Sequence, residues 1–276
     1  MTKRSLMTAA LALVSAGAFA QISFTGNYSE NFNTWPKEDD PGVSEGISLA
    51  WTNNVTKLGW YQGTQPSANG AIISNTELII GQAVGLTKLQ SLGMPFDTDR
   101  AIGSGIGTEF QTNRNPIFWG FRLQNNTGAT IDSVNVEFDV ENWMAPRNEV
   151  EGFPAEQNVT FGQYRVGGTN FNLKDFTNAS QMNLTSLPPV DGNPGPLNGN
   201  LAENKSHVLA TLSSLNWQVG DSLWIRWQDP DNRNRDAIFG IDNLSVVQGA
   251  PVPEPATLLL LGVGSSLLAL RKRKRS

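Results

Sequence analysis

The sequence contains no cysteine and only one histidine among its 276 residues. Without cysteine the chain can form no disulfide bond, and thiol catalysis, cysteine-ligated zinc and iron–sulfur clusters are excluded. The single histidine, His207, belongs to no catalytic motif, so we expect a strand residue rather than the base of a Ser-His-Asp triad. A cofactor-binding loop, a zincin motif and a nucleophile elbow are missing as well. We therefore predict that the protein has no catalytic residue and is not an enzyme.

Basic residues are scarce over most of the chain. Residues 1–20 and 271–275 hold seven of the 20 lysines and arginines, which leaves 13 basic and 24 acidic side chains in residues 21–250. The net charge of −11 on that segment repels phosphate backbones, so we expect no nucleic-acid partner. Such a surface suits an exported soluble domain or one that collects divalent cations.

The N-terminal residues 1–20 have the order of a secretory signal peptide. Two basic residues, Lys3 and Arg4, precede an apolar stretch, and the segment ends in Ala18-Phe19-Ala20. A small-x-small tripeptide after a short apolar stretch is the cleavage pattern of such peptides. We predict that the mature chain begins at Gln21.

The C-terminal residues 251–276 form a second segment with three parts. A Pro-Glu-Pro motif at 253–255 precedes a run of apolar and small residues at 256–270, which we predict to be a transmembrane helix. Five basic residues follow, and by the positive-inside rule they stop transfer and stay cytoplasmic. The motif residues are Pro253, Glu254 and Pro255, and the basic cluster is Arg271, Lys272, Arg273, Lys274 and Arg275.

This order of motif, apolar helix and terminal Arg/Lys cluster closely resembles the PEP-CTERM sorting signal of Gram-negative envelope proteins. The resemblance implies an exosortase as partner, with processing near Pro253, Glu254 and Pro255. It also implies export through the inner membrane, transient anchoring there, and final delivery to the cell surface or the extracellular matrix. A generic anchor behind a proline-rich linker is the alternative.

Residues 21–250 are predicted to form one all-β ectodomain, an antiparallel β-sandwich of the jelly-roll type. Short apolar segments alternate with loops rich in Asn, Gly and Pro, and only residues 83–92 have helical spacing. Residues 117–124 and 131–143 are predicted to pair as a hairpin, and residues 206–212 to pair with 222–228. In 131–143, Val134, Val136 and Phe138 share one face while acidic residues share the other, the pattern of a sheet with one buried side.

Several stretches carry a second resemblance. Trp51-Thr52-Asn53-Asn54, Asp99-Arg100-Ala101-Ile102 and Phe239-Gly240-Ile241-Asp242-Asn243-Leu244 look like parts of the jelly-roll ectodomains found in PEP-CTERM proteins. Those ectodomains are similar in outline to carbohydrate-binding and laminin-G-like sandwiches. The resemblance implies a fold and little chemistry.

Residues with outward parity on the clearest strands suggest a ligand face. Aromatic planes beside charged groups can stack against and hydrogen-bond a sugar, so we predict a face that contacts exopolysaccharide of a biofilm matrix. Its members are Arg122, Asp139, Trp143, Trp224 and Arg226. Two alternatives remain: the outward tryptophans are covered and the protein is a purely structural surface protein, or Glu137 and Glu141 serve a glycan hydrolase.

Two sets of acidic residues suggest a structural Ca²⁺ ion. Glu30 on an early strand and Asp242 on the last one occupy the positions where jelly rolls often hold such an ion. Asp229, Asp231 and Asp236 form a separate acidic loop. Neither set has EF-hand spacing, and solvated acids or turn caps are the alternative.

Overall fold

The computed structural model describes residues 21–37, 48–65, 70–81, 86–94, 97–105, 115–147, 157–172, 174–192, 195–232 and 236–249. The predicted signal peptide and the C-terminal segment 251–276 lie outside these residues. No helix within the described ranges has the length and apolar character needed to cross a membrane. The domain boundaries at residues 20 and 250 therefore stay predictions.

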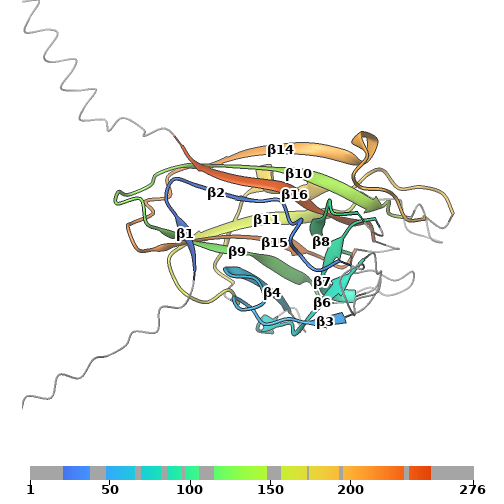
Figure 1. Cartoon of the computed structure of the whole chain (residues 1–276), viewed down its shortest axis with the longest axis horizontal. Helices are drawn as coiled ribbons and strands as arrows, with labels where there is room; N and C mark the ends of the chain where they lie inside the picture. The colour runs from blue at the N-terminus through green and yellow to red at the C-terminus, as the bar shows by residue number, and fades with distance from the viewer. Residues whose placement is uncertain are drawn as a thin grey trace, which may run out of the picture.

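The described residues form two facing β-sheets and almost no helix, which confirms the all-β prediction (Figure 1). The first sheet has the order β12 (Thr177–Asn178), β11 (Val159–Val166), β15 (Ser222–Asp229), β9 (Ile117–Asn125), β4 (Trp60–Thr64) and β5 (Ile73–Ser74), with β1 (Ile22–Phe24) on β9 and β13 (Leu184–Thr185) on β11. The second has the order β14 (Lys205–Leu212), β10 (Val134–Met144), β16 (Ile238–Gln248), β8 (Ala101–Gly105), β7 (Leu86–Leu92), β6 (Glu77–Ile80) and β3 (Ser48–Ala50), with β2 (Asn27–Glu30) on β16. Two 3₁₀ turns, η1 (Ser180–Met182) and η2 (Ala202–Asn204), complete the described elements.

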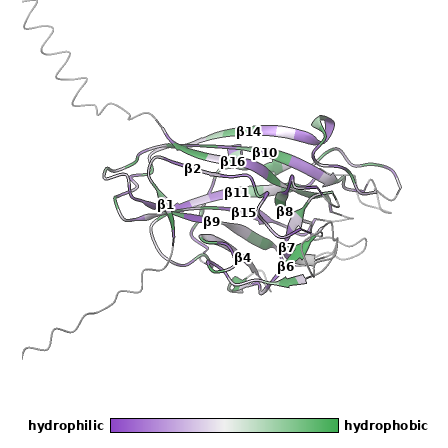
Figure 2. Ribbon diagram, in the orientation of Figure 1, coloured by the Kyte–Doolittle hydropathy of each residue, from purple (hydrophilic) through white to green (hydrophobic). Residues whose placement is uncertain are grey.

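The sheets are mixed rather than purely antiparallel. Most neighbours run antiparallel, but β1 pairs in parallel with β9 and β6 pairs in parallel with β7. Hydrophilic and hydrophobic residues alternate along β10 and β14, as expected for strands with one buried face (Figure 2).

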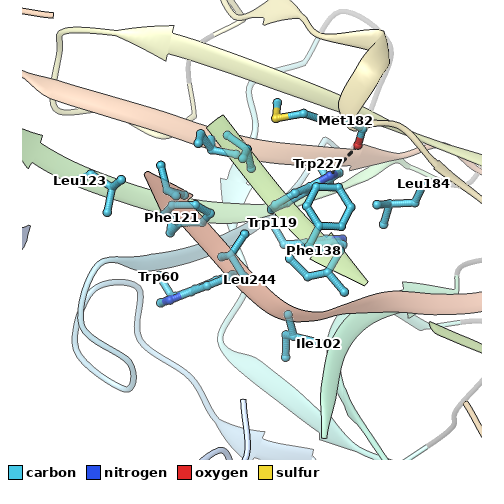
Figure 3. Close-up of a cluster of buried hydrophobic side chains, with 14 of the residues drawn as sticks. Trp60, Ile102, Trp119, Phe121, Leu123, Phe138, Met182, Leu184, Trp227 and Leu244 are labelled. Atoms are coloured by element: carbon cyan, nitrogen blue, oxygen red, sulfur yellow. Dashed lines mark hydrogen bonds between the residues drawn. The ribbon is translucent and has the colours of Figure 1, made fainter. Parts of the chain in front are cut away.

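The main core lies between the sheets and is rich in aromatic rings. Trp119 and Trp227 stack with their centroids 4.8 Å apart, and Phe138 of the opposite sheet meets Trp227 edge-on at 5.5 Å (Figure 3). The indole N–H of Trp227 donates to the carbonyl of Met182 at 3.0 Å, so this buried polar group is satisfied. The alternating aliphatic residues of β10 lie in the same cluster, as the sequence predicts.

The predicted strand pairings at 117–143 and 206–228 are wrong. β9 and β10 lie in opposite sheets, and so do β14 and β15. Both connections cross from one sheet to the other at the same end of the sandwich, where Ile131 and Trp217 form an isolated antiparallel bridge. Side-chain alternation tells which face of a strand is buried, but it does not tell which strand lies beside it.

The predicted helix at 83–92 is also wrong where the structure describes it. Leu86–Leu92 is the strand β7. Its neighbouring residues Leu89 and Gln90 are both fully buried, so both faces of this strand are covered. A bulge against β8 shifts the register between Leu86 and Gln90. A strand buried on both faces shows no period-two pattern, and its leucines can then imitate helical spacing.

Candidate functional site

An exposed network of polar side chains spans three adjacent strands of the second sheet. Asp139 on β10 lies opposite His207 on β14, and their Oδ1 and Nδ1 atoms are 2.9 Å apart. Asn243 on β16 donates from Nδ2 to the other oxygen of Asp139 at 3.0 Å. The other ring nitrogen of His207 lies 3.1 Å from Glu137. The contact with Asp139 raises the pKa of His207, because a carboxylate on each side favours the protonated ring.

A backbone irregularity brings Asn243 into this network. The pairing of β16 with β10 shifts between Glu137 and Asp139, and Asn243 has a φ of 51° at that point. Asparagine tolerates the left-handed region better than most residues. The bulge places its amide beside Asp139, and the Asn243 side chain also lines a neighbouring pocket.

This pocket is lined by residues of the paired strands β2 and β16 and of the segments after β2 and before β4, and has a volume of about 490 Å³. Lys57 lies 2.8 Å from the carboxylate of Glu30 and 5.6 Å from the ring centroid of Trp35. The backbone N–H of Phe32 donates to the same carboxylate at 3.2 Å. We call it the polar pocket, and its lining residues are Ser29, Glu30, Asn31, Thr34, Lys57, Asn243, Leu244 and Ser245.

The predicted ligand residues of the first sheet are covered by protein. Trp224 is fully buried, and its indole N–H donates to the carbonyl of Gly168 at 3.1 Å. Tyr61 meets it edge-on at 4.8 Å, and Phe171 packs 6.0 Å from it. The segment from Gly167 to Phe176, of which residue 173 is not described, thus closes over the outer face of this sheet; we call it the covering segment.

Arg122 and Arg226 lie under or beside the same covering segment. The guanidinium of Arg226 donates to Gln163 at 2.8 Å and to the carbonyl of Phe171 at 2.9 Å, and burial lowers the pKa of Arg226 to about 9. Arg122 lies over the Trp224 ring at 5.1 Å and donates to the hydroxyl of Ser222 at 2.7 Å. Both arginines are therefore structural partners of the covered aromatic cluster.

The prediction of one shared ligand face is wrong. Arg122, Trp224 and Arg226 lie on the first sheet, whereas Asp139 and Trp143 lie on the second. Trp143 is fully buried against Leu92 and Ile238, and a Cβ atom at Gly199 would lie 2.3 Å from its ring. Only Asp139 keeps appreciable exposure to solvent. Sequence parity places these residues away from the main core correctly, but it cannot show that loops cover them.

Glu30 of the predicted calcium pair is not one of the three described side chains that lie close enough to share a metal, whereas Asp242 is. Glu30 pairs with Lys57 in the polar pocket. Asp242 instead meets Glu141 of β10 and Asp99 of the loop before β8, and one carboxylate oxygen from each of the three lies within 4.8 Å of the others. We call these three residues the acidic cluster. Burial raises the pKa of both Glu141 and Asp242 to about 7.

The predicted calcium loop Asp229, Asp231 and Asp236 does not converge on one ion either. Within the described ranges, the acidic cluster is the only group of three acidic or histidine side chains close enough to share a metal. Asp229 is buried and accepts hydrogen bonds from Ser104 at 2.6 Å and Thr160 at 3.2 Å. Burial raises the pKa of Asp229 to about 7. Its role is to join β15 to β8 and β11.

The geometry gives the hydrolase alternative no support. Glu137 is exposed beside His207, whereas Glu141 is fully buried in the acidic cluster, so the two share no open cleft. A glycosidase needs both carboxyl groups on either side of one scissile bond. The described contacts of His207 are with Glu137 and Asp139, and neither provides the nucleophile of a triad.

Sequence reasoning missed two features. The polar pocket depends on the pairing of β2 with β16, which no local pattern reveals. Asp99 joins Asp242 through the pairing of β8 with β16, although the two residues are far apart in the sequence. The position of Glu141 among the polar residues of β10 could have pointed to the acidic cluster, because a carboxylate that becomes buried there requires a partner.

A comparison with protein families identifies the C-terminal segment. The family model described as the PEP-CTERM protein-sorting motif matches residues 251–275, which lie outside the described residues. No curated protein matches the chain. The chain therefore carries the sorting motif that its sequence predicts.

Three solved structures illustrate what this chain is similar to. A carbohydrate-binding module with specific mannan recognition, TmCBM27, shares 11% identity over 74% of this chain and 96% of its own, with a TM-score of 0.36. A module specific for non-crystalline cellulose shares 10% over 74% and 97%, with a TM-score of 0.30. The K1 adhesin domain of Lys-gingipain from Porphyromonas gingivalis W83 shares 11% over 81% and 99%, with a TM-score of 0.34. Alignments this loose define no ligand for this chain.

Proposed function

We propose that this protein is exported, held at the inner membrane by residues 251–276 and processed there by an exosortase for display on the cell surface or in the biofilm matrix. The observation that carries this proposal is the match of residues 251–275 to the PEP-CTERM sorting motif. In this reading Arg271 to Arg275 stop transfer on the cytoplasmic side, and residues 256–270 cross the membrane. The predicted signal peptide at residues 1–20 starts the export.

Replacing Pro253, Glu254 and Pro255 together by alanine should abolish processing of the tail. The alanines keep the apolar run and the basic cluster, so membrane insertion continues while the recognition motif is lost. We would compare the mass of the parent and the variant in a host that carries an exosortase. A matched control replaces Pro251 alone, which lies outside the Pro-Glu-Pro triplet at 253–255. If the triple variant is processed like the parent, the sorting part of the proposal is wrong.

The ectodomain, in this proposal, contacts exopolysaccharide at the polar pocket and the adjoining Asp139–His207–Asn243 network. A volume of about 490 Å³ is within the range of small-ligand pockets. Its lining offers hydroxyl, amide, ammonium and carboxylate groups, which match the donors and acceptors of a sugar. Asn243 belongs to both features, so one glycan chain could contact the pocket and the exposed network together.

Burial of the tryptophans favours a second candidate, a structural surface protein without a sugar site. All eight tryptophans of the sequence are at most 3% exposed. Stacking on an exposed aromatic ring is a common source of sugar affinity, and no tryptophan of this chain offers such a ring. Binding measurements separate the two candidates.

Replacing Lys57 by methionine should weaken glycan binding about tenfold or more, because the variant loses a charge-assisted hydrogen bond worth about 1.5 to 3 kcal/mol. The methionine keeps an apolar stem beside Trp35, so the fold should persist. We would screen the full chain against a polysaccharide panel and then titrate the best glycan. The exposed Gln218, which does not line the pocket, provides the control Gln218→Ala. A parent chain that binds no member of the panel would instead support the structural candidate.

A further inference from the structure

We propose that the acidic cluster of Asp99, Glu141 and Asp242 is a Ca²⁺-binding site that fastens the loop before β8 to the middle of the second sheet. The three ligands come from three elements: Asp99 precedes β8, Glu141 lies on β10 and Asp242 lies on β16. These strands are neighbours in the order β10, β16 and β8. The site is distinct from the pair Glu30 and Asp242, because Glu30 belongs to the polar pocket.

The separation of the oxygens fits one calcium ion. One oxygen from each carboxylate lies within 4.8 Å of the other two. Ca²⁺ binds oxygen at about 2.3 to 2.6 Å, so two ligands of one ion lie at most about 5 Å apart. An ion between the three side chains therefore requires little movement of the chain.

Burial gives an independent reason to expect a ligand. Asp242 is 1% exposed and Glu141 is fully buried. Neither carboxyl oxygen of Asp242 has a well-formed hydrogen bond within the described part of the chain. Removing a carboxylate from water without a partner costs several kcal/mol, so such a group requires a cation or a proton. The cluster thus contains an unsatisfied buried acceptor aimed at two other carboxylates.

The charge balance matches a divalent ion. The ammonium of Lys205 lies 2.6 Å from Glu141 and compensates one of the three negative charges. Two negative charges remain, equal in size to the charge of one Ca²⁺. All donors are hard oxygens and none is a sulfur or an imidazole nitrogen, which favours Ca²⁺ over zinc. Mg²⁺ is less suited, because it keeps several waters and this site is largely closed.

The ligand from the loop is held in place by hydrogen bonds. The backbone N–H of Asp99 donates to Asp97 at 3.1 Å. The side-chain amide of Asn200 donates to Asp97 at 3.2 Å and to the carbonyl of Asp99 at 3.5 Å. Asp99 itself is only half-buried, so an ion could enter from its side. The loop therefore presents a positioned carboxylate at the open side of a buried pair.

Calcium titration of the full chain in detergent, after treatment with EDTA, tests this proposal. We expect one Ca²⁺ per chain by isothermal titration calorimetry and a melting temperature that rises with added Ca²⁺ but hardly with Mg²⁺. Asp242→Asn should weaken Ca²⁺ binding at least about 100-fold. Loss of an outer-shell partner costs up to about 100-fold in metal affinity, and loss of a direct ligand should cost at least as much. Without metal, this variant should melt no lower than the metal-free parent, because it lacks one of the repelling charges.

A matched variant on the same strand separates the cluster from general acidity. Glu137→Gln removes an exposed carboxylate of β10 outside the cluster and should keep the stoichiometry and the affinity of the parent. Glu141→Gln should lose Ca²⁺ binding as Asp242→Asn does. The proposal would be overturned if Ca²⁺ neither raised the melting temperature of the parent chain nor produced binding heat in the titration. Unchanged Ca²⁺ affinity in both cluster variants, or an equal response of the parent to Mg²⁺, would overturn it as well.

Discussion

Replacing Trp224 by alanine should lower the free energy of unfolding by about 3 to 5 kcal/mol, the usual cost of removing a buried tryptophan side chain. The indole is fully buried and lies among Tyr61, Phe118 and Phe171. Its removal leaves a cavity under the covering segment and an unpaired carbonyl at Gly168, which now accepts from the indole at 3.1 Å. Urea denaturation of the full chain, followed by circular dichroism, measures this loss.

The control for this variant is an exposed aromatic residue of the same sheet. Phe161 on β11 is 41% exposed, so Phe161→Ala should cost much less than Trp224→Ala. A Trp224→Ala variant that is as stable as Phe161→Ala would show that the covering segment does not close over the sheet. In that case Trp224 would return as a candidate for stacking against a sugar.

Raising the pH from 5 to 8 should destabilise the parent relative to Asp229→Asn by on the order of 3 kcal/mol. Burial raises the pKa of Asp229 from 3.8 to about 7. Between these values the folded protein keeps a proton that the unfolded chain has released, so each added pH unit costs about 1.4 kcal/mol of stability. The loss ends above pH 7, where both states are ionised. Asparagine cannot ionise, and it can occupy the same place between Ser104 and Thr160.

Urea denaturation at several pH values, with Ca²⁺ held constant, measures this difference between the two chains. The comparison of parent and variant isolates Asp229 from the acidic cluster, because all other groups are shared. Glu203 is exposed, and Glu203→Gln should follow the pH profile of the parent. Parallel profiles for the parent and Asp229→Asn would contradict a raised pKa at this position.

The sequence predicts the class of fold well because side-chain alternation is a local signal. Val134, Val136 and Phe138 face the main core as their spacing indicates. Leu223, Ile225 and Trp227 also face the main core, on β15.

The sequence does not predict which strands lie side by side, because this depends on connections that cross between the sheets. Turn chemistry at 125–128 suggests a hairpin, but Asn125 instead uses its side chain to bind the carbonyls of Ala129 and Trp217 and so supports a crossover.

The candidate sites were less predictable for the same reason. Asp242 was expected near a metal, and the structure gives it two acidic neighbours; these come from Asp99 and Glu141 rather than from Glu30. Trp143 and Trp224 have the predicted parity, but loops cover both of them. A loop that closes over a sheet face is a long-range feature, and polar segments rich in Asn and Gly give no local signal of where they pack.

The end of the sandwich that holds the crossovers is also the end from which both chain termini leave. The first and last strands finish at this same end: Phe24 pairs with Asn125, and Gln248 donates its backbone N–H to the carbonyl of Gly26 at 2.8 Å. In the proposed function the tether of residues 251–276 leaves the ectodomain from this end, so the crossover loops are its part nearest the membrane. Glu141 lies seven residues along β10 from Val134, the partner of Gln248, or roughly 23 Å at 3.3 Å per residue. In the proposed function the acidic cluster therefore lies well away from the tethered end, and a cation can reach its buried carboxylates from the side of the half-buried Asp99.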